Sequence, residues 1–203
     1  MFIPQQKEEF FQMPTSTTKR DDILDSALTL FAERGFDATT IPMIATDAKV
    51  GAGTIYRYFA NKEVLVNTLF QHYVTLFKEA LEKDYPEGAD IREQFHHLFQ
   101  GMIRFTNEHD HALYFIKTHT SAYFLDASSR EQFGHLLMIF EDFFEAGKQH
   151  GHIRPLPSKA LIAIIFGGFL QLYQLIRVGE LEASAELLAG VEESCWDAVR
   201  HHS

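Results

Sequence analysis

Residues 53–59 combine hydroxyl, phenol and guanidinium side chains, which donate hydrogen bonds to phosphate oxygens and to the edges of bases. The residues concerned are Thr54, Tyr56, Arg57 and Tyr58. Ile55 and Phe59 are four residues apart, so on a helix both point to the side away from Arg57. The spacing predicts a short helix that buries Ile55 and Phe59 and presents a polar face suited to DNA.

A second short helix is expected directly before this one. Thr40 is a suitable N-cap and Pro42 is tolerated in a first helical turn. Four apolar residues then repeat with helical spacing: Ile41, Ile44, Ala45 and Ala48. Gly51 and Gly53 are expected to supply the unusual backbone conformations of a tight turn between the helices. The pattern is that of a helix-turn-helix motif.

The residues of this motif divide into two kinds of expected DNA contact. Arg57, Tyr56 and Tyr58 are expected to bind phosphates, which set position and give salt-dependent affinity. Few side chains are available to read bases, and the candidates are Thr54, Ala52 and Lys49. Gly53 allows the backbone to approach the bases closely. DNA shape is therefore expected to contribute to specificity.

Three linked blocks around the motif resemble the DNA-binding domain of the TetR-type (TetR/AcrR) bacterial transcriptional regulators. They are ILDSALTLFAERGFDATTI at residues 23–41, VGAGTIYRYF at residues 50–59 and NKEVL at residues 61–65. The resemblance implies operator contacts by Thr40, Ala52, Gly53, Thr54, Tyr56, Arg57, Tyr58 and Lys62. The sequence departs from the family pattern in two places, since Lys49 stands where glycine is usual and Gly51 where serine or alanine is usual.

The rest of the chain has helical periodicity and no convincing strand pattern. We predict an all-α fold of about nine helices. It would comprise an N-terminal arm (1–18), a three-helix DNA-binding domain (19–64) and a larger helical ligand-binding and dimerisation domain (65–203). The first helix of the DNA-binding domain is expected to stop at Gly35. A long helix is expected to begin after Asn61, a suitable N-cap, and to run toward Leu81 with two apolar stripes that each need a partner. Further helices are expected at 91–107, 110–124, 128–150, 158–178 and 183–201.

The formal net charge of −10 is unevenly distributed. Residues 1–62 contain 7 Lys and Arg against 8 Asp and Glu, and residues 63–203 contain 11 against 20, which gives −1 and −9. An acidic C-terminal part is repelled by DNA, so the charge should orient the molecule with its N-terminal domain toward the duplex.

The second domain is rich in phenylalanine, a residue type that packs cores and also lines apolar cavities. Core packing is the more common role for any single Phe. For the domain as a whole we expect a cavity for an apolar or aromatic small molecule. The candidate lining residues are Tyr73, Phe77, Phe99, Met102, Phe105, Phe115, His119 and Phe143.

The last two expected helices are candidates for self-association. The segment 160–173 is apolar nearly all round, and glycines at 167 and 168 permit close helix approach. A four-helix interface about a twofold axis would use Phe166, Phe169, Leu170, Tyr173, Leu188, Val191 and Cys195. The alternative is that this helical pair only buries its own core. We expect a homodimer, which also suits paired recognition helices.

Other function classes find little support in the sequence. The 11 histidines lack the spacing of a metal site, so we expect no metal and treat a metal-responsive regulator as a minor alternative. Hydrolase, Walker A and metalloprotease motifs are absent, and no enzyme activity or cofactor is expected. One cysteine, no secretory signal and an apolar run of 11 residues predict a cytoplasmic protein without a membrane span.

These observations favour a TetR-like transcriptional regulator, most simply a repressor. It would bind double-stranded operator DNA as a homodimer and be released by a small apolar or aromatic effector. The alternative from another class is a helical interaction protein whose helix-turn-helix does not bind specific DNA.

Overall fold

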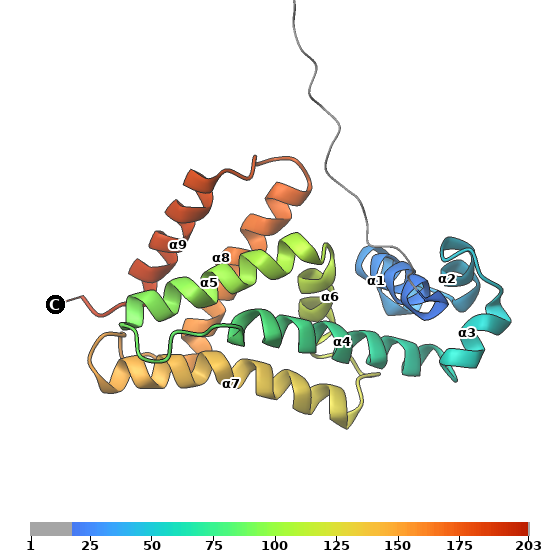
Figure 1. Cartoon of the computed structure of the whole chain (residues 1–203), viewed down its shortest axis with the longest axis horizontal. Helices are drawn as coiled ribbons and strands as arrows, with labels where there is room; N and C mark the ends of the chain where they lie inside the picture. Colours follow the sequence, from blue (N-terminus) through green and yellow to red (C-terminus); the bar gives the residue numbers. More distant parts are fainter. Residues whose placement is uncertain (1–17, 203) are drawn as a thin grey trace, which may run out of the picture.

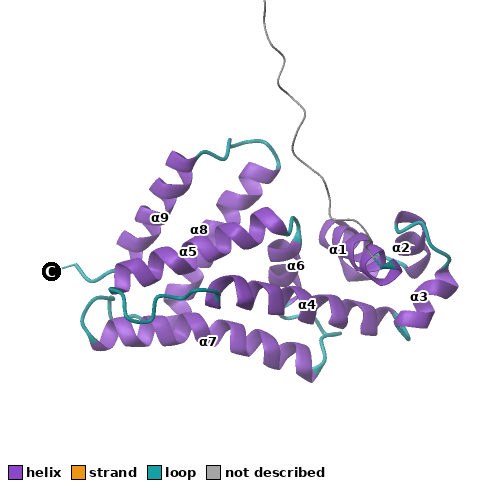
Figure 2. Cartoon of the chain, in the orientation of Figure 1, coloured by secondary structure: helices purple, strands orange, loops and turns teal. Residues whose placement is uncertain are grey.

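The computed structural model describes residues 18–202, and within that range the chain is helical and has no strand (Figures 1 and 2). The helices are α1 (Lys19–Ala38), α2 (Ile41–Asp47), α3 (Ala52–Tyr58), α4 (Lys62–Glu82), α5 (Ile91–Glu108), α6 (Ala112–His119), α7 (Ala127–Gln149), α8 (Ser158–Arg177) and α9 (Ala185–Val199). The all-α prediction is confirmed. The expected arm at 1–18 lies outside the described residues except for Thr18.

Polar side chains fix the starts of the two helices that bound the N-terminal unit. Thr18 accepts a hydrogen bond from the backbone N–H of Asp21, and the Asp21 carboxylate accepts one from the backbone N–H of Thr18. Asn61 likewise accepts from the backbone N–H of Val64 at 2.8 Å. The reciprocal pair at Thr18 and the single bond at Asn61 satisfy backbone N–H groups that have no partner within the helix.

Helix α4 connects the N-terminal unit to the rest of the molecule (Figure 1). It packs on α1 at its beginning and on α5, α6 and α7 further along. The two predicted apolar stripes are buried apart from the half-buried Leu76. Their members are Leu65, Leu69, Tyr73 and Leu76, and Val66, Phe70, Val74 and Phe77. The expectation that this helix has partners on two sides is therefore confirmed.

A glycine permits the close approach of α5 to α4. A Cβ atom added at Gly101 of α5 would lie 2.9 Å from the backbone oxygen of Ala80 in α4, which no real side chain tolerates. The approach brings Phe105 onto Phe77, with ring centroids 4.6 Å apart and planes 22° apart. Phe77 of this stacked pair also lines the cavity described below.

Two predicted helix boundaries differ from the structure. The helix predicted at 110–124 forms only over α6, because His111 has a left-handed backbone (φ 68°) and the chain turns after His119. Gly35, where the first helix is expected to stop, has a non-helical backbone at φ 76°, but a further helical segment continues to Ala38. In both places a left-handed residue changes the direction of the chain, and the sequence indicated Gly35 but not His111.

Candidate DNA-binding helix and internal cavity

Helices α2 and α3 form a pair anchored by a small apolar core. Thr40 caps α2 by accepting from the backbone N–H of Met43 at 3.4 Å. Ile44 and Ile55 have no exposed surface, and Phe59 is 2% exposed. The buried side of each helix is the one that the sequence predicted, so the opposite side of α3 faces solvent. In Figure 1, α3 lies at the end of the molecule farthest from α9.

The turn between these helices is made differently from the prediction. Gly51 has an ordinary extended backbone (φ −74°) and Gly53 lies within α3, so the expectation that these glycines supply unusual conformations is wrong. The left-handed residue is Lys49, at φ 53°. The position where glycine is usual in the resembling family is thus the one that needs a positive φ, and Lys49 adopts it here despite its Cβ. Val50 packs half-buried against the core.

The solvent side of α3 presents side chains without internal partners. Tyr56 is 55% exposed, Tyr58 is 47% exposed and Arg57 is exposed. Within residues 18–202, no hydrogen bond or ion pair engages these three side chains. Gly53 is exposed, and a Cβ added there would meet no atom within 4 Å, so no internal packing requires a glycine at this position. This side of α3 has the donors and the open backbone that a DNA groove requires.

The remaining expected DNA contacts have mixed surroundings. Thr40 and Lys49 are exposed, whereas Ala52 and Thr54 are half-buried. The Lys62 ammonium donates to the backbone oxygens of Phe36 at 2.8 Å and Thr39 at 2.9 Å, and it lies 4.0 Å from the centroid of the Phe36 ring. Two of its three N–H donors therefore tie α4 to the end of α1.

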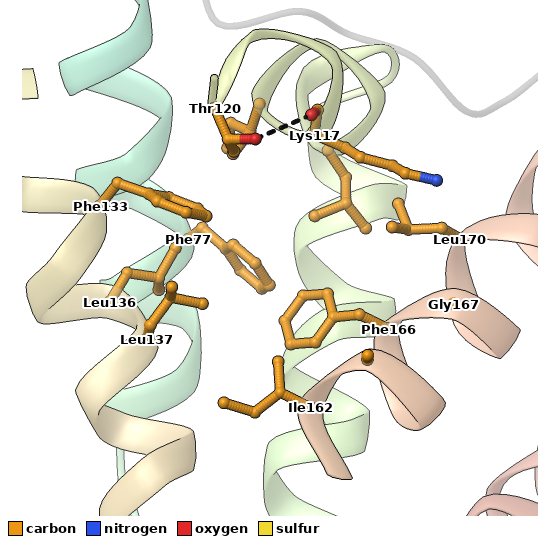
Figure 3. Close-up of a pocket in the computed structure, with 13 residues that line it drawn as sticks. Phe77, Lys117, Thr120, Phe133, Leu136, Leu137, Ile162, Phe166, Gly167 and Leu170 are labelled. Carbon is orange, nitrogen blue, oxygen red and sulfur yellow. Dashed lines mark hydrogen bonds between the residues drawn. The ribbon is translucent and has the colours of Figure 1, made fainter. Parts of the chain in front are cut away.

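A cavity of about 380 Å³ lies between α4, α6, α7 and α8 (Figure 3). Its volume falls within the range typical of small-molecule sites. The walls are almost entirely apolar. The lining residues are Phe77, Leu113, Ile116, Lys117, Thr120, Phe133, Leu136, Leu137, Ile162, Ala163, Phe166, Gly167 and Leu170.

The segment that follows α6 joins the cavity wall to α1. Phe124 stacks on Phe36 of α1 with ring centroids 3.9 Å apart. The Tyr123 hydroxyl donates to the Asp37 carboxylate at 2.9 Å. Helix α6 itself also packs on α1. The element that forms this wall of the cavity is therefore in direct contact with the N-terminal unit, so a movement of α6 would reach α1.

A buried amide ties the same segment to α4. The Asn67 side chain donates to the backbone oxygen of Phe124 at 2.8 Å and accepts from the backbone N–H of Asp126 at 2.9 Å and the hydroxyl of Ser129 at 2.8 Å. Buried amides with several partners specify one arrangement, because losing any of these bonds leaves a buried polar group unsatisfied.

Two family models match the chain, one over the DNA-binding helices and one over the part that contains the cavity. The family described as bacterial regulatory proteins, tetR family, matches residues 23–69. The family described as tetracyclin repressor-like, C-terminal domain, matches residues 70–201. The chain belongs to the TetR family of bacterial regulators. The first match covers the helix-turn-helix and the second covers the cavity.

Curated proteins that are similar to this chain include transcriptional regulators from Bacillus and Mycobacterium. The fatty acid metabolism regulator protein of Bacillus subtilis is 37% identical over 82 residues, which is 40% of this chain and 42% of that protein. The repressor KstR2 of Mycobacterium tuberculosis is 32% identical over 95 residues, 47% of each chain. The matches thus span slightly less than half the length of these curated relatives.

Solved TetR-family structures share the fold over nearly the whole chain. A regulator from Marinobacter aquaeolei VT8 has a TM-score of 0.77 at 25% identity and covers 91% of this chain and 96% of its own. The fatty acid degradation regulator FadR from Bacillus halodurans has a TM-score of 0.69 at 22% identity and covers 93% and 100%. The second similarity shows the fold alone.

The structure places the predicted pocket residues mostly outside the cavity. Phe77 lines it, whereas Tyr73, Phe99, Met102, Phe105, Phe115, His119 and Phe143 do not. Phe99, Met102 and Phe143 surround a separate void of about 10 Å³, too small for a ligand. The other four are core residues, and their assignment to the cavity is corrected accordingly. The sequence pattern identifies inward-facing positions but does not distinguish those facing a void from those facing another side chain.

His119 and Tyr73 show what these core positions do instead. His119 Nδ1 is 2.8 Å from the backbone oxygen of Phe115, and burial lowers the pKa of its imidazole. Burial also raises the pKa of the Tyr73 phenol, which lies beside His109 with ring centroids 5.6 Å apart. Both polar groups stay neutral within the core.

Two of the predicted dimer contacts, Phe169 and Cys195, are corrected because both are buried within the chain, and the other five remain predictions. Phe166 and Leu170 line the cavity, and Phe169 and Cys195 are buried within the chain. The Tyr173 hydroxyl donates to the backbone oxygen of Thr106 at 2.8 Å, and Leu188 and Val191 pack half-buried on the core. The outward face of α8 instead carries Ala160, Ala163, Ile164, Gly167, Gly168 and Gln171. The helical spacing of small residues along 160–171 is the sequence signal that could have identified this face.

Helix α8 is unusually apolar for its exposure. Its most apolar 18-residue window has a mean hydropathy of 1.6, yet only 22% of that window is buried within the chain. By length and composition this helix is sufficient to cross a membrane, which the run of 11 residues seen in the sequence did not indicate. Its opposite face is buried against α7 and α9 through Leu161, Ile165 and Phe169.

Proposed function

We propose that this TetR-family protein regulates transcription by binding operator DNA as a homodimer, and that a small apolar molecule in the cavity releases it. The observation that carries the proposal is the solvent side of α3. Tyr56, Arg57 and Tyr58 are exposed on a helix held by Ile55 and Phe59, and no hydrogen bond or ion pair with residues 18–202 engages their side chains. Exposed donors on a rigid, well-anchored helix suit recognition of the major groove.

The side chains of α3 and its neighbours serve different parts of the duplex in this proposal. Arg57, Tyr56 and Tyr58 bind phosphates and position the protein. Thr54 and Lys49, with the Ala52 methyl group against thymine, read base edges, and Gly53 admits the backbone close to them. Thr40 and Lys62 reach phosphates with the donors that their internal hydrogen bonds leave free.

A second copy of the chain is the partner that we propose for the outward face of α8. Its opposite face packs on α7 and α9, so we assign the exposed apolar face to another protein surface rather than to a bilayer. Gly167 and Gly168 permit close helix packing, and Ile164 is 41% exposed. Dimerisation there would pair two recognition helices on half-sites about one helical turn, or a multiple of it, apart.

The cavity is the effector site in this proposal. Its apolar walls exclude polar metabolites and fit an apolar or aromatic molecule. The names of the Bacillus subtilis and Bacillus halodurans relatives, which refer to fatty acid metabolism and degradation, agree with such an effector. Repression is the proposed mode because KstR2 is named a repressor. The described residues contain no group of three or more metal-binding side chains to favour a metal-responsive regulator.

Helix α6 is the element that couples the two sites. It forms one wall of the cavity, and the segment after it holds α1 through Phe124 and Tyr123 and α4 through Asn67. An effector that displaces α6 therefore moves the recognition helices, provided that it binds the displaced state more tightly. Shifting the population from 1:99 to 99:1 requires a difference of about 5.5 kcal/mol.

The test is a gel shift with duplex DNA from the region flanking the protein's own gene, over a series of salt concentrations. The proposal predicts retardation with two chains per duplex and an affinity that falls as salt increases. A protein that interacts only with other proteins through these helices gives no retardation even at low salt, which would refute the DNA-binding role.

A further inference from the structure

The cavity has one polar end. Two residues one turn apart at the end of α6, Lys117 and Thr120, supply the polar side chains of an otherwise apolar lining. Figure 3 shows both at the same end of the cavity, with the Lys117 side chain extending toward Leu170. Ligand sites of this kind use a few polar groups to orient an apolar molecule.

Lys117 is exposed at the rim of the cavity, and its ammonium has no anionic partner among residues 18–202. Among the residues that the structure describes, it takes part in no ion pair or hydrogen bond, and it is the only charged residue that lines the cavity. The Thr120 hydroxyl donates to the backbone oxygen of Lys117 at 3.2 Å. The neighbouring His119 is turned into the core, where its Nδ1 meets the backbone oxygen of Phe115.

The carboxyl end of α6 lies beside Lys117, and its helix dipole affects whether a negatively charged ligand group can bind there. The carboxyl end of α6 presents the negative end of the helix dipole, which repels a negative ligand group. An anion at this end of the cavity is stable only if a cation offsets that repulsion, and Lys117 is the cation in place.

We propose that the effector is an apolar monoanion, with its charged group at Lys117 and its apolar body among Phe77, Leu136 and Phe166. The proposal depends on the effector role of the cavity given above and specifies the chemical class of that effector. A carboxylate on an aliphatic chain or on an aryl-alkyl body has this chemistry. Lys117 is the residue that distinguishes such an acid from the alcohol of the same size.

The test compares two matched pairs of probes by isothermal titration calorimetry, each below its micelle concentration. The pairs are decanoate with 1-decanol and 4-phenylbutyrate with 4-phenyl-1-butanol. The wild-type protein should bind at least one acid about threefold to tenfold more tightly than its alcohol, because a partly exposed charge pair is worth about 1 kcal/mol. That preference should diminish as salt is added.

The Lys117→Gln variant should lose the preference for the acid and bind the alcohol as the wild type does. Lys83→Gln is the matched control, because Lys83 is exposed and does not line the cavity. Lys117 also lies in the last turn of α6, where a cation stabilises the helix. That role alone would lower thermal stability in Lys117→Gln and leave the acid-to-alcohol affinity ratio unchanged.

Three results would overturn the proposal: equal affinity for acid and alcohol in both pairs, a preference that persists in Lys117→Gln, or no binding of either pair. A gel shift on the same preparation separates this failure from that of the proposed function. If the duplex is still bound and the alcohols bind the cavity as well as the acids do, only the assignment of an anionic effector fails. If no duplex is retarded, the regulatory function itself fails.

Discussion

The solvent side of α3 and the cavity between α4, α6, α7 and α8 are both proposed binding sites, but they are built in opposite ways. Tyr56 and Tyr58 of α3 are 55% and 47% exposed, whereas Phe77 and Leu136 in the cavity wall are each 1% exposed. Binding at α3 must therefore come from charge and hydrogen bonds in competition with water and salt. Binding in the cavity comes from apolar burial, which salt weakens little.

The largest expected difference between the two regions is in stability. Phe77→Ala should lower the free energy of unfolding by about 3–5 kcal/mol, because it removes a buried ring that stacks on Phe105. Tyr56→Ala, its counterpart on α3, should change that free energy by less than about 0.5 kcal/mol. Urea unfolding followed by circular dichroism measures both. Equal losses in the two variants would show that α3 is not the free surface described here.

The next largest effect concerns DNA affinity. Arg57→Ala should weaken binding of the flanking duplex about tenfold or more, since a hydrogen bond to a charged group is worth about 1.5–3 kcal/mol, and should reduce the salt slope by about one. Fluorescence anisotropy at several salt concentrations gives both quantities. Lys83→Ala, which removes a cation far from α3 in sequence, is the control. An unchanged affinity and slope for Arg57→Ala would remove its phosphate role.

A smaller effect should appear when the pH is lowered. Burial lowers the pKa of His119, so the unfolded chain takes up a proton near its ordinary value of 6.5 before the folded protein does. Stability should therefore be fully present above pH 6.5 and fall as the pH decreases below it, by at most about 1.4 kcal/mol per pH unit for one proton. Urea unfolding between pH 7.5 and 5.5 measures the slope.

His119→Gln should flatten this pH dependence without abolishing it, because burial also lowers the pKa values of His72 and His109. The same slope in the variant and in the wild type would mean that His119 does not contribute.

The smallest expected effect is at the link between the two regions. Tyr123→Phe removes the hydroxyl that donates to Asp37 but keeps the ring, which should change duplex affinity by no more than about twofold to fivefold. Asp37→Asn combined with Tyr123→Phe should add little to the single change. Additive effects in this double-mutant cycle would mean that the contact does not connect α6 with α1.

The two regions also differ in how well the sequence predicts them. The anchors of α3, Ile55 and Phe59, follow from spacing within one helix, and Thr40 and Asn61 follow from capping chemistry. Such signals are local, so they can be recognised in the sequence without knowledge of the tertiary structure. The left-handed Lys49 escaped prediction because lysine is an uncommon residue in that conformation and the nearby glycines suited it better.

The cavity depends instead on how four helices meet. Phe77 and Phe105 are both inward-facing helix residues, yet the first lines the cavity and the second lies behind it. On α8, Phe166 faces the cavity while Phe169 is buried elsewhere in the core. These outcomes are set by crossing angles and neighbouring side chains, which helical periodicity does not encode.

The most direct test of the account is reciprocal binding of the duplex and the cavity ligand. Anisotropy gives the affinity for the flanking duplex with and without a saturating probe, decanoate or 4-phenylbutyrate, and calorimetry gives the affinity for that probe with and without duplex. The account predicts that each ligand weakens the other by the same factor. Duplex affinity that is unchanged at a saturating concentration of the bound probe would contradict it.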